Sequence, residues 1–112
     1  DRLAPMIRRL VCTLFVLLAS LRLDAQVLYG SLVGSVTDSS GAAVPNAKIE
    51  VRNSATGLSR DTNSDDRGNF QFNNLPGGSY VVNISAASFS KFEQTDLAIN
   101  ANTTVRIDAR LN

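Results

Sequence analysis

Residues 64–80, SDDRGNFQFNNLPGGSY, contain two turns on either side of a short aromatic strand. The stretch from Asp65 to Gly68 has the composition of a tight hairpin turn, because Asp bonds its own backbone and Gly adopts a positive φ at little cost. LPGGSY forms a second turn and ends on an aromatic residue. Phe70 and Phe72 lie two positions apart, so their rings point to the same side of the strand. The stretch therefore predicts a hairpin, followed by a corner that returns the chain to a core.

The same two-residue period runs through the chain from Tyr29 onward and is typical of half-buried strands. In NAKIEVRN (46–53) apolar residues alternate with charged ones, and TTVRIDARL (103–111) repeats this pattern. Turn-forming residues separate the runs at short intervals, which indicates a β-sandwich or a small barrel. About seven strands are expected, at 30–37, 46–53, 57–63, 68–73, 79–86, 91–98 and 103–111.

One face of each strand is apolar, and together these faces suffice for one modest core. The residues expected to point inward are Leu32, Gly34, Val36, Ala47, Ile49, Val51, Tyr80, Val82, Ile84, Val105, Ile107, Ala109 and Leu111, with Phe70, Phe72, Leu75, Phe89 and Phe92.

The N-terminal segment has a different composition from the rest. Two arginines precede an apolar run of 12 residues (10–21), and a short polar end follows. This is the layout of a secretory signal peptide, which we place at 1–25 as a helix, with cleavage after Ala25. Met6 is the natural start, so residues 1–5 are read as upstream sequence. A permanent anchor is the alternative, but the run is shorter than the roughly 20 residues that cross a bilayer.

The predicted mature domain, 26–112, has no cysteine and no histidine. Disulfides, Cys-His and Ser-His nucleophile pairs and the usual zinc ligand sets are therefore excluded from it. It carries seven basic and eight acidic residues, for a formal charge of −1. This near-neutral balance argues against nucleic acid as a partner.

A calcium site is one interpretation of residues 61–72. Asp61, Asn63, Asp65 and Asn69 have the spacing of EF-hand loop positions 1, 3, 5 and 9. Position 6, which requires Gly, holds Asp66, and position 12, which requires a bidentate Glu, holds Phe72. We therefore expect a solvated hairpin turn here, with no metal and no cofactor.

A carbohydrate site or an acid–base pair is a further alternative. Sugar rings stack on exposed aromatic side chains, and the candidates are Tyr29 and one of Phe89 or Phe92. Packing in or beside the core is the favoured role for these rings. Asp65 and Asp66 are adjacent in a turn and diverge, so they cannot act as a pair. No catalytic residue is expected.

Five short motifs follow one another along residues 34–89, from Gly34-Val36-Asp38 to Phe89. Together they resemble the carboxypeptidase regulatory-like domain. The resemblance covers residues 28–111 and implies a non-catalytic, all-β fold: a seven-stranded antiparallel Greek-key β-sandwich of the transthyretin-like or Ig-like kind. Ser88 departs from the family pattern, which often has Gly before Phe89. The matching residues are Gly34-Val36-Asp38, Ala47-Ile49-Val51, Asp65-Gly68-Phe70, Leu75-Pro76-Gly78-Tyr80 and Phe89.

The segment QVLYGSLVGSVTD (26–38), after a signal peptide, is similar to the N-terminus of Oar-like TonB-dependent outer-membrane receptors. That resemblance implies a periplasmic accessory module that contacts the protein surface of an outer-membrane receptor or envelope component. The plug and barrel that would link it to the membrane are not part of the sequence given, which is then expected to be either a fragment or a free-standing secreted domain. A carbohydrate-binding module and a surface-structural or adhesin-type domain remain alternatives.

Overall fold

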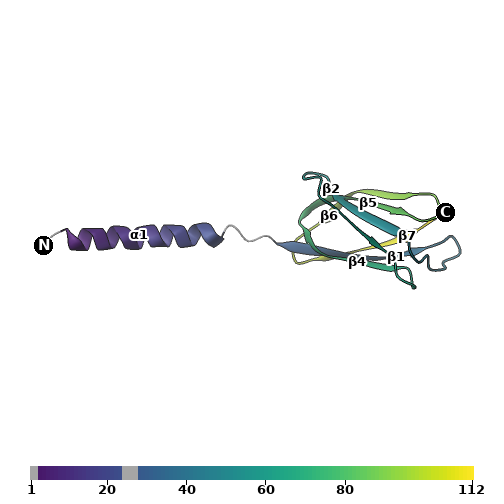
Figure 1. The fold of residues 1–112 in the computed structure, drawn as a ribbon, viewed down its shortest axis with the longest axis horizontal. Coiled ribbons are helices and arrows are strands. Elements are labelled where there is room, and N and C mark those ends of the chain that lie inside the picture. Colours follow the sequence, from purple (N-terminus) through teal and green to yellow (C-terminus); the bar gives the residue numbers. More distant parts are fainter. Residues whose placement is uncertain (1–2, 24–27) are drawn as a thin grey trace.

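The structure of the protein, a computed structural model, describes the backbone of residues 3–23 and 28–112 and the side chains of 3–15 and 28–112. A helix precedes seven strands (Figure 1). The elements are α1 (Ala4–Leu23), β1 (Tyr29–Thr37), β2 (Lys48–Asn53), β3 (Ser59–Asn63), β4 (Asn69–Pro76), β5 (Gly78–Ser85), β6 (Phe92–Ile99) and β7 (Thr104–Arg110).

The strands form two sheets, one of three strands in the order β4-β1-β7 and one of four in the order β3-β2-β5-β6. The chain passes from one sheet to the other after β1, β3, β4 and β6, so each sheet is built from segments distant in sequence. This confirms the predicted seven-stranded sandwich. The strand limits differ from the expected ones by at most three residues, most at the C-terminal end of β4, which reaches Pro76.

One strand pair corrects the prediction of a wholly antiparallel fold. β1 and β7 run parallel, in register from Ser31 opposite Thr104 to Thr37 opposite Arg110. Alternation of apolar and polar residues is the same whichever way a strand runs, so the pattern could not predict this direction. The two strands come from opposite ends of the domain and lie side by side in the three-stranded sheet (Figure 1).

The core lies between the sheets and confirms the predicted inward faces. Val105, Phe89 and Phe92 are only partly buried and pack against its margin. Each fully buried aliphatic or aromatic side chain contributes about 1.5–3 kcal/mol. The buried hydrophobic residues are Leu32, Val36, Val44, Ala47, Ile49, Val51, Phe70, Phe72, Leu75, Tyr80, Val82, Ile84, Leu97, Ile99, Ile107, Ala109 and Leu111.

Gly34 explains how the ring of Phe70 fits into this core. A Cβ atom at position 34 would lie 2.5 Å from that ring and 1.9 Å from the backbone oxygen of Ile107. Only glycine leaves room for both neighbours, which is why the strand carries Gly at an inward position.

Two edge strands are interrupted by β-bulges. Asn74 in β4 and Asp96 in β6 have positive φ values of 57° and 56°, and the strand register shifts beside each of them. Asn and Asp tolerate this conformation better than other non-glycine residues. A bulge bends an edge strand and so hinders its pairing with another chain.

The helix α1 carries apolar side chains on its surface, among them Ile7, Leu14 and Phe15. Within the described residues, no helix is both long enough and apolar enough to cross a membrane. The predicted cleavage point after Ala25 lies outside the described residues.

Candidate functional site

The residues weighed as calcium ligands lie in and beside the hairpin that the sequence predicts. Asp65 Oδ1 accepts hydrogen bonds from the backbone nitrogens of Arg67 at 2.9 Å and Asn69 at 2.8 Å. Gly68 completes the turn with a φ of 79°. These bonds are those of an Asx-turn, so the Asp65 carboxylate stabilises the turn itself.

The other residues weighed as calcium ligands make different contacts. Asp61 lies 3.7 Å from Lys48 Nζ in an exposed ion pair, and Asn63 is exposed on β3. Across 3–23 and 28–112, the structure brings together no group of three or more His, Cys, Asp or Glu side chains suited to a metal.

Asp38 stabilises the loop that follows β1 in a similar way. Its Oδ1 accepts hydrogen bonds from Ser40 Oγ at 2.6 Å and from the backbone nitrogens of Ser40 at 2.9 Å and Ala42 at 3.0 Å. The side-chain hydrogen bond from Ser40, with the bond from Ala42, holds the pKa of Asp38 below its ordinary value. Arg110 adds a bond of 2.7 Å to the Ser39 carbonyl. The loop from residue 38 to 42 is therefore held in a defined shape.

Ser64 is a buried polar residue that the sequence analysis did not single out. Its side chain donates a hydrogen bond of 2.7 Å to the Val44 carbonyl and accepts one of 2.9 Å from the Ala47 nitrogen. The residue is 3% exposed. Ser64 thereby fixes the segment 44–47 against the end of β3. Sequence alone offered no signal, because a serine before a turn is ordinary.

The loops that carry these bonds lie at the end of the sandwich that holds the C-terminus (Figure 1). Together with residues 86–89 they line a cleft. The hollow has a volume of about 330 Å³. We name it the end cleft. It is lined by Asp38, Ala43, Val44, Pro45, Asn46, Ala86, Ala87 and Phe89.

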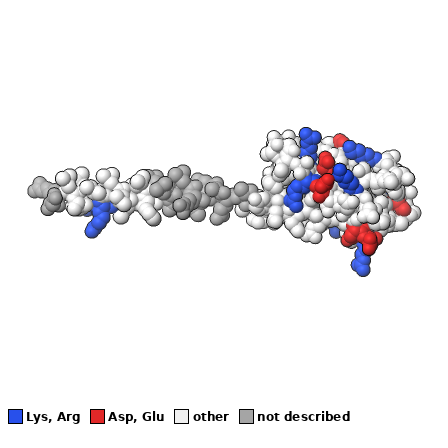
Figure 2. Space-filling model, viewed as in Figure 1, with Lys and Arg blue, Asp and Glu red and all other residues white. Residues whose placement is uncertain are grey.

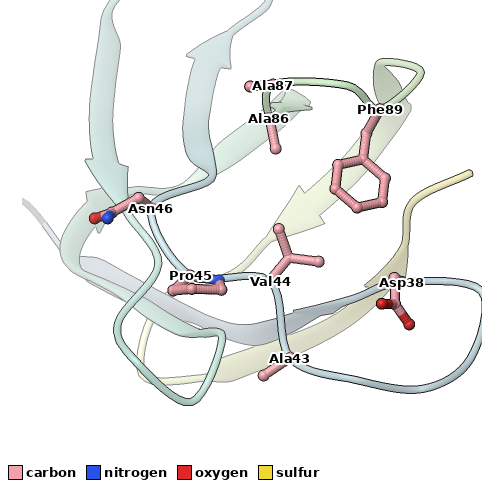
Figure 3. A pocket seen from close by; sticks show the side chains of 8 residues that line it. All are labelled: Asp38, Ala43, Val44, Pro45, Asn46, Ala86, Ala87 and Phe89. Carbon is pink, nitrogen blue, oxygen red and sulfur yellow. The ribbon is translucent and has the colours of Figure 1, made fainter.

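Figure 3 shows how the lining residues lie in the end cleft. The ring of Phe89 and the side chain of Val44 face each other across the hollow, and Ala86 points in beside them. The Asp38 carboxylate stands at the rim, whereas Asn46 points away. The cleft thus has an apolar interior with a polar margin, the usual character of a binding pocket.

The segment that carries Phe89 has an unusual backbone. Ser88 has a φ of 71°, in the left-handed region that favours glycine, and this explains why the family often has Gly at that position. The backbone nitrogen of Ser90 donates a hydrogen bond of 2.7 Å to the Asn112 carbonyl, which ties the segment to the C-terminal residues. Phe89 is consequently held in place from both sides.

The three aromatic candidates do not share one surface. Tyr29 is 45% exposed at the start of β1, at the opposite end of the sandwich from the end cleft. Phe92 is half-buried against the core, and Phe89 is half-buried while also lining the end cleft. Among them, Phe89 alone lines that cleft.

The match to known families is clear over most of the chain. Residues 31–112 match the model of the carboxypeptidase regulatory-like domain. The chain belongs to this family. Its motif residues now have structural roles: Asp38 and Asp65 form Asx-turns, and Gly34 admits Phe70.

Solved structures share the fold of this carboxypeptidase regulatory-like domain at low sequence identity. A candidate carbohydrate binding protein from Bacteroides uniformis is 22% identical with a TM-score of 0.60, and the match covers 72% of this chain and 40% of that protein. Another, from Pseudomonas aeruginosa, is 15% identical with a TM-score of 0.55, and the match covers 76% and 90%. Catechol 1,2-dioxygenase from Acinetobacter is 12% identical with a TM-score of 0.60, and the match covers 80% and 54%.

These similarities show the fold alone. The chain spans 40% of the Bacteroides uniformis protein and 54% of the dioxygenase. No curated protein matches the chain by sequence.

Proposed function

We propose that this carboxypeptidase regulatory-like domain is a non-catalytic binding module of an exported envelope protein. Residues 1–25 serve as its signal peptide, cut after Ala25, and residues 26–112 form the module. It is an accessory module of a TonB-dependent outer-membrane receptor-like protein and contacts a protein surface through the end cleft.

The proposal rests on the hydrogen bonds that three polar residues, Asp38, Asp65 and Ser64, make within the fold. Asp38 and Asp65 each use Oδ1 to accept hydrogen bonds from turn amides, and Ser64 uses its hydroxyl to bond the backbone. These contacts give all three residues a role in holding the loops in place. A preformed cleft with a half-buried aromatic ring is suited to binding.

The export part is tested by producing the whole chain in a Gram-negative host. N-terminal sequencing of the periplasmic protein is expected to begin at Gln26. A chain that stays in the cytoplasm, or that keeps α1 in a membrane fraction, contradicts the signal-peptide assignment.

The receptor part is tested by the DNA downstream of the codon for Asn112. An in-frame continuation into a plug and a barrel supports the proposal, whereas a stop codon followed by an unrelated gene contradicts it. The contact surface is then mapped with a photo-crosslinking amino acid at position 89. The matched control is position 56, in the exposed turn at the other end of the sandwich. Crosslinks to the receptor are expected from position 89 only.

A second candidate function is carbohydrate binding. It is favoured by Phe89, whose ring lies beside the polar rim of the end cleft, and by the fold shared with two candidate carbohydrate binding proteins. Retention in gels that contain polysaccharides tests it. Phe89→Ala is expected to lose retention on neutral polysaccharides, while Tyr29→Ala, at the other end, keeps it.

A further inference from the structure

Strand β7 forms one edge of the three-stranded sheet, and its outer side has no neighbouring strand in the described part of the chain. The backbone nitrogen of Ser31 donates a hydrogen bond of 2.9 Å to the Thr103 carbonyl, and that of Leu111 donates one of 2.8 Å to the Thr37 carbonyl. Backbone groups point to alternate sides along a strand, so the odd-numbered residues bond β1. The N–H and C=O groups of the even-numbered residues of β7 therefore point away from the sheet.

The other three edge strands are protected, whereas β7 is not. Bulges at Asn74 and Asp96 interrupt β4 and β6. At β3, the Arg60 guanidinium donates a hydrogen bond of 2.6 Å to the Asn73 carbonyl on β4, which bridges these two edges. No residue of β7 has a positive φ, and its register with β1 runs without a shift. A regular edge strand of this kind is a template for pairing with another strand.

The charges on β7 decide which strand can lie beside it. Arg106, Asp108 and Arg110 are exposed on the outer face of the three-stranded sheet, where β1 and β4 place uncharged side chains. On the neighbouring edge strand β6, Glu93 points to the outer face of the other sheet, and Asp96 stands at the bulge. Basic and acidic side chains are interspersed over the face of the sandwich in Figure 2, so no single-sign patch repels a second copy there.

We propose that β7 pairs with β7 of a second copy of this chain. The two strands run antiparallel across a two-fold axis at Ile107, so the two three-stranded sheets join into one continuous sheet. Arg106 and Asp108 of each copy then lie opposite Asp108 and Arg106 of the other, which forms two ion pairs. Arg110 lies opposite Thr104. This surface is separate from the end cleft, so the proposal does not depend on what the end cleft binds.

The backbone and the charges together select this register. Only even-numbered residues have outward backbone groups, so the axis must pass through a residue and not between two. An axis at Arg106 places that residue opposite itself, and an axis at Asp108 places Asp108 opposite itself and Arg106 opposite Arg110. Like charges directly opposite one another destabilise a strand pair. An axis at Ala109 pairs opposite charges, but only residues 108–110 of β7 would then overlap.

The first test is hydrogen exchange of the ¹⁵N-labelled full chain, followed by NMR at low and high concentration. The outward amides of Arg106 and Asp108 are expected to exchange at least about tenfold more slowly when the dimer forms. The amides of Ile107 and Ala109 already bond β1 and are expected to be slow at both concentrations. A chain that sediments as a monomer up to about 1 mM overturns the proposal, as does slowing confined to β6 or to α1.

Charge-reversal variants test the register. In Arg106→Glu residues 106 and 108 are both acidic, and in Asp108→Lys both are basic. Each variant alone is expected to dimerise at least about tenfold more weakly, because every opposite-charge pair becomes a like-charge pair. An equimolar mixture of the two restores opposite charges at both positions. The mixture is expected to form a heterodimer as well as the unchanged chain forms its dimer.

Matched controls separate the contact from the fold. Arg67→Glu and Asp66→Lys make the same charge changes in the exposed turn at 65–68 and are expected to leave the dimer unchanged. Circular dichroism checks that each variant folds, since Arg106 and Asp108 also form a 3.0 Å ion pair within β7. A mixture of folded variants that stays monomeric overturns the proposal. So do dimers that survive either charge reversal, because their contact lies elsewhere on the chain.

Discussion

The hydroxyl of Tyr80 donates a hydrogen bond to the backbone carbonyl of Pro76, four residues earlier in the chain. The ring of Tyr80 fills the core, and the residue is 1% exposed. The bond spans the corner between β4 and β5, so it joins the Leu-Pro turn of the motif to the aromatic residue that ends it. This hydrogen bond explains why the motif combines a Leu-Pro turn with a tyrosine.

Tyr80→Phe is expected to destabilise the domain by about 1–2 kcal/mol. The substitution removes the hydrogen bond but keeps the ring, and loss of a largely buried bond costs this much. Urea unfolding followed by circular dichroism measures the change. Tyr29→Phe removes a hydroxyl from an exposed ring and is expected to have no effect, so an equal loss in both variants contradicts the role of the corner.

Gly34→Ala is expected to destabilise the domain by about 3 kcal/mol or more, because overpacking against backbone cannot be relieved by a rotamer change. The added Cβ lies 1.9 Å from the Ile107 carbonyl oxygen. Gly77→Ala is the control, since a Cβ there makes an ordinary contact of 3.6 Å. Thermal unfolding of both variants compares them, and similar melting temperatures contradict the packing argument.

Ser88→Gly is expected to stabilise the domain by up to about 1 kcal/mol. A left-handed residue other than glycine costs about 1–2 kcal/mol, and this gain exceeds the entropy that glycine adds to the unfolded chain. Ser90→Gly, two residues later, has no positive φ to relieve and is expected to destabilise slightly. A lower melting temperature for Ser88→Gly shows that the serine hydroxyl matters more than the backbone.

The carboxylate of Asp108 makes stability depend on pH. The side-chain hydrogen bond from Arg106, with a further bond of 2.8 Å from Ser35 Oγ, holds the pKa of Asp108 below its ordinary value of 3.8. Because the folded-state pKa is the lower one, this contribution is present well above pH 3.8 and is lost as the pH falls through the folded value.

A carbon-detected titration of the Asp108 carboxyl group is expected to give a midpoint below 3.8. In Arg106→Gln the midpoint moves up toward that value. The destabilisation caused by Asp108→Asn is expected at pH 7 and shrinks as the pH falls below 3.8. A midpoint that Arg106→Gln leaves in place contradicts the assignment of the cause.

The sequence predicted the local features of this fold. Alternation depends on neighbouring residues, so it placed the seven strands and the inward faces, and the turn residues at 65–68 folded as expected. The parallel pairing of β1 with β7 could not be predicted, because it depends on which distant strands meet. The positive φ values at Asn74 and Asp96 likewise follow from a register imposed by the partner strand.

The candidate sites were harder to predict from the sequence than the fold was. The sequence predicted the hairpin at 65–68, because turn-forming residues are a local property. It did not find the end cleft, whose residues come from segments about 40 positions apart. It also missed Ser64, because burial of a polar side chain depends on what packs over it.

The parallel pairing of β1 and β7 also determines how the domain responds to a pulling force. The first strand enters at one end of the sandwich and the last strand leaves at the other, with seven residue pairs in register between them. A load applied between Tyr29 and Arg110 therefore acts along the strands and shears all the connecting hydrogen bonds at once, rather than opening them one by one. The domain is therefore expected to resist tension along this axis more strongly than a fold whose terminal strands are opened pair by pair.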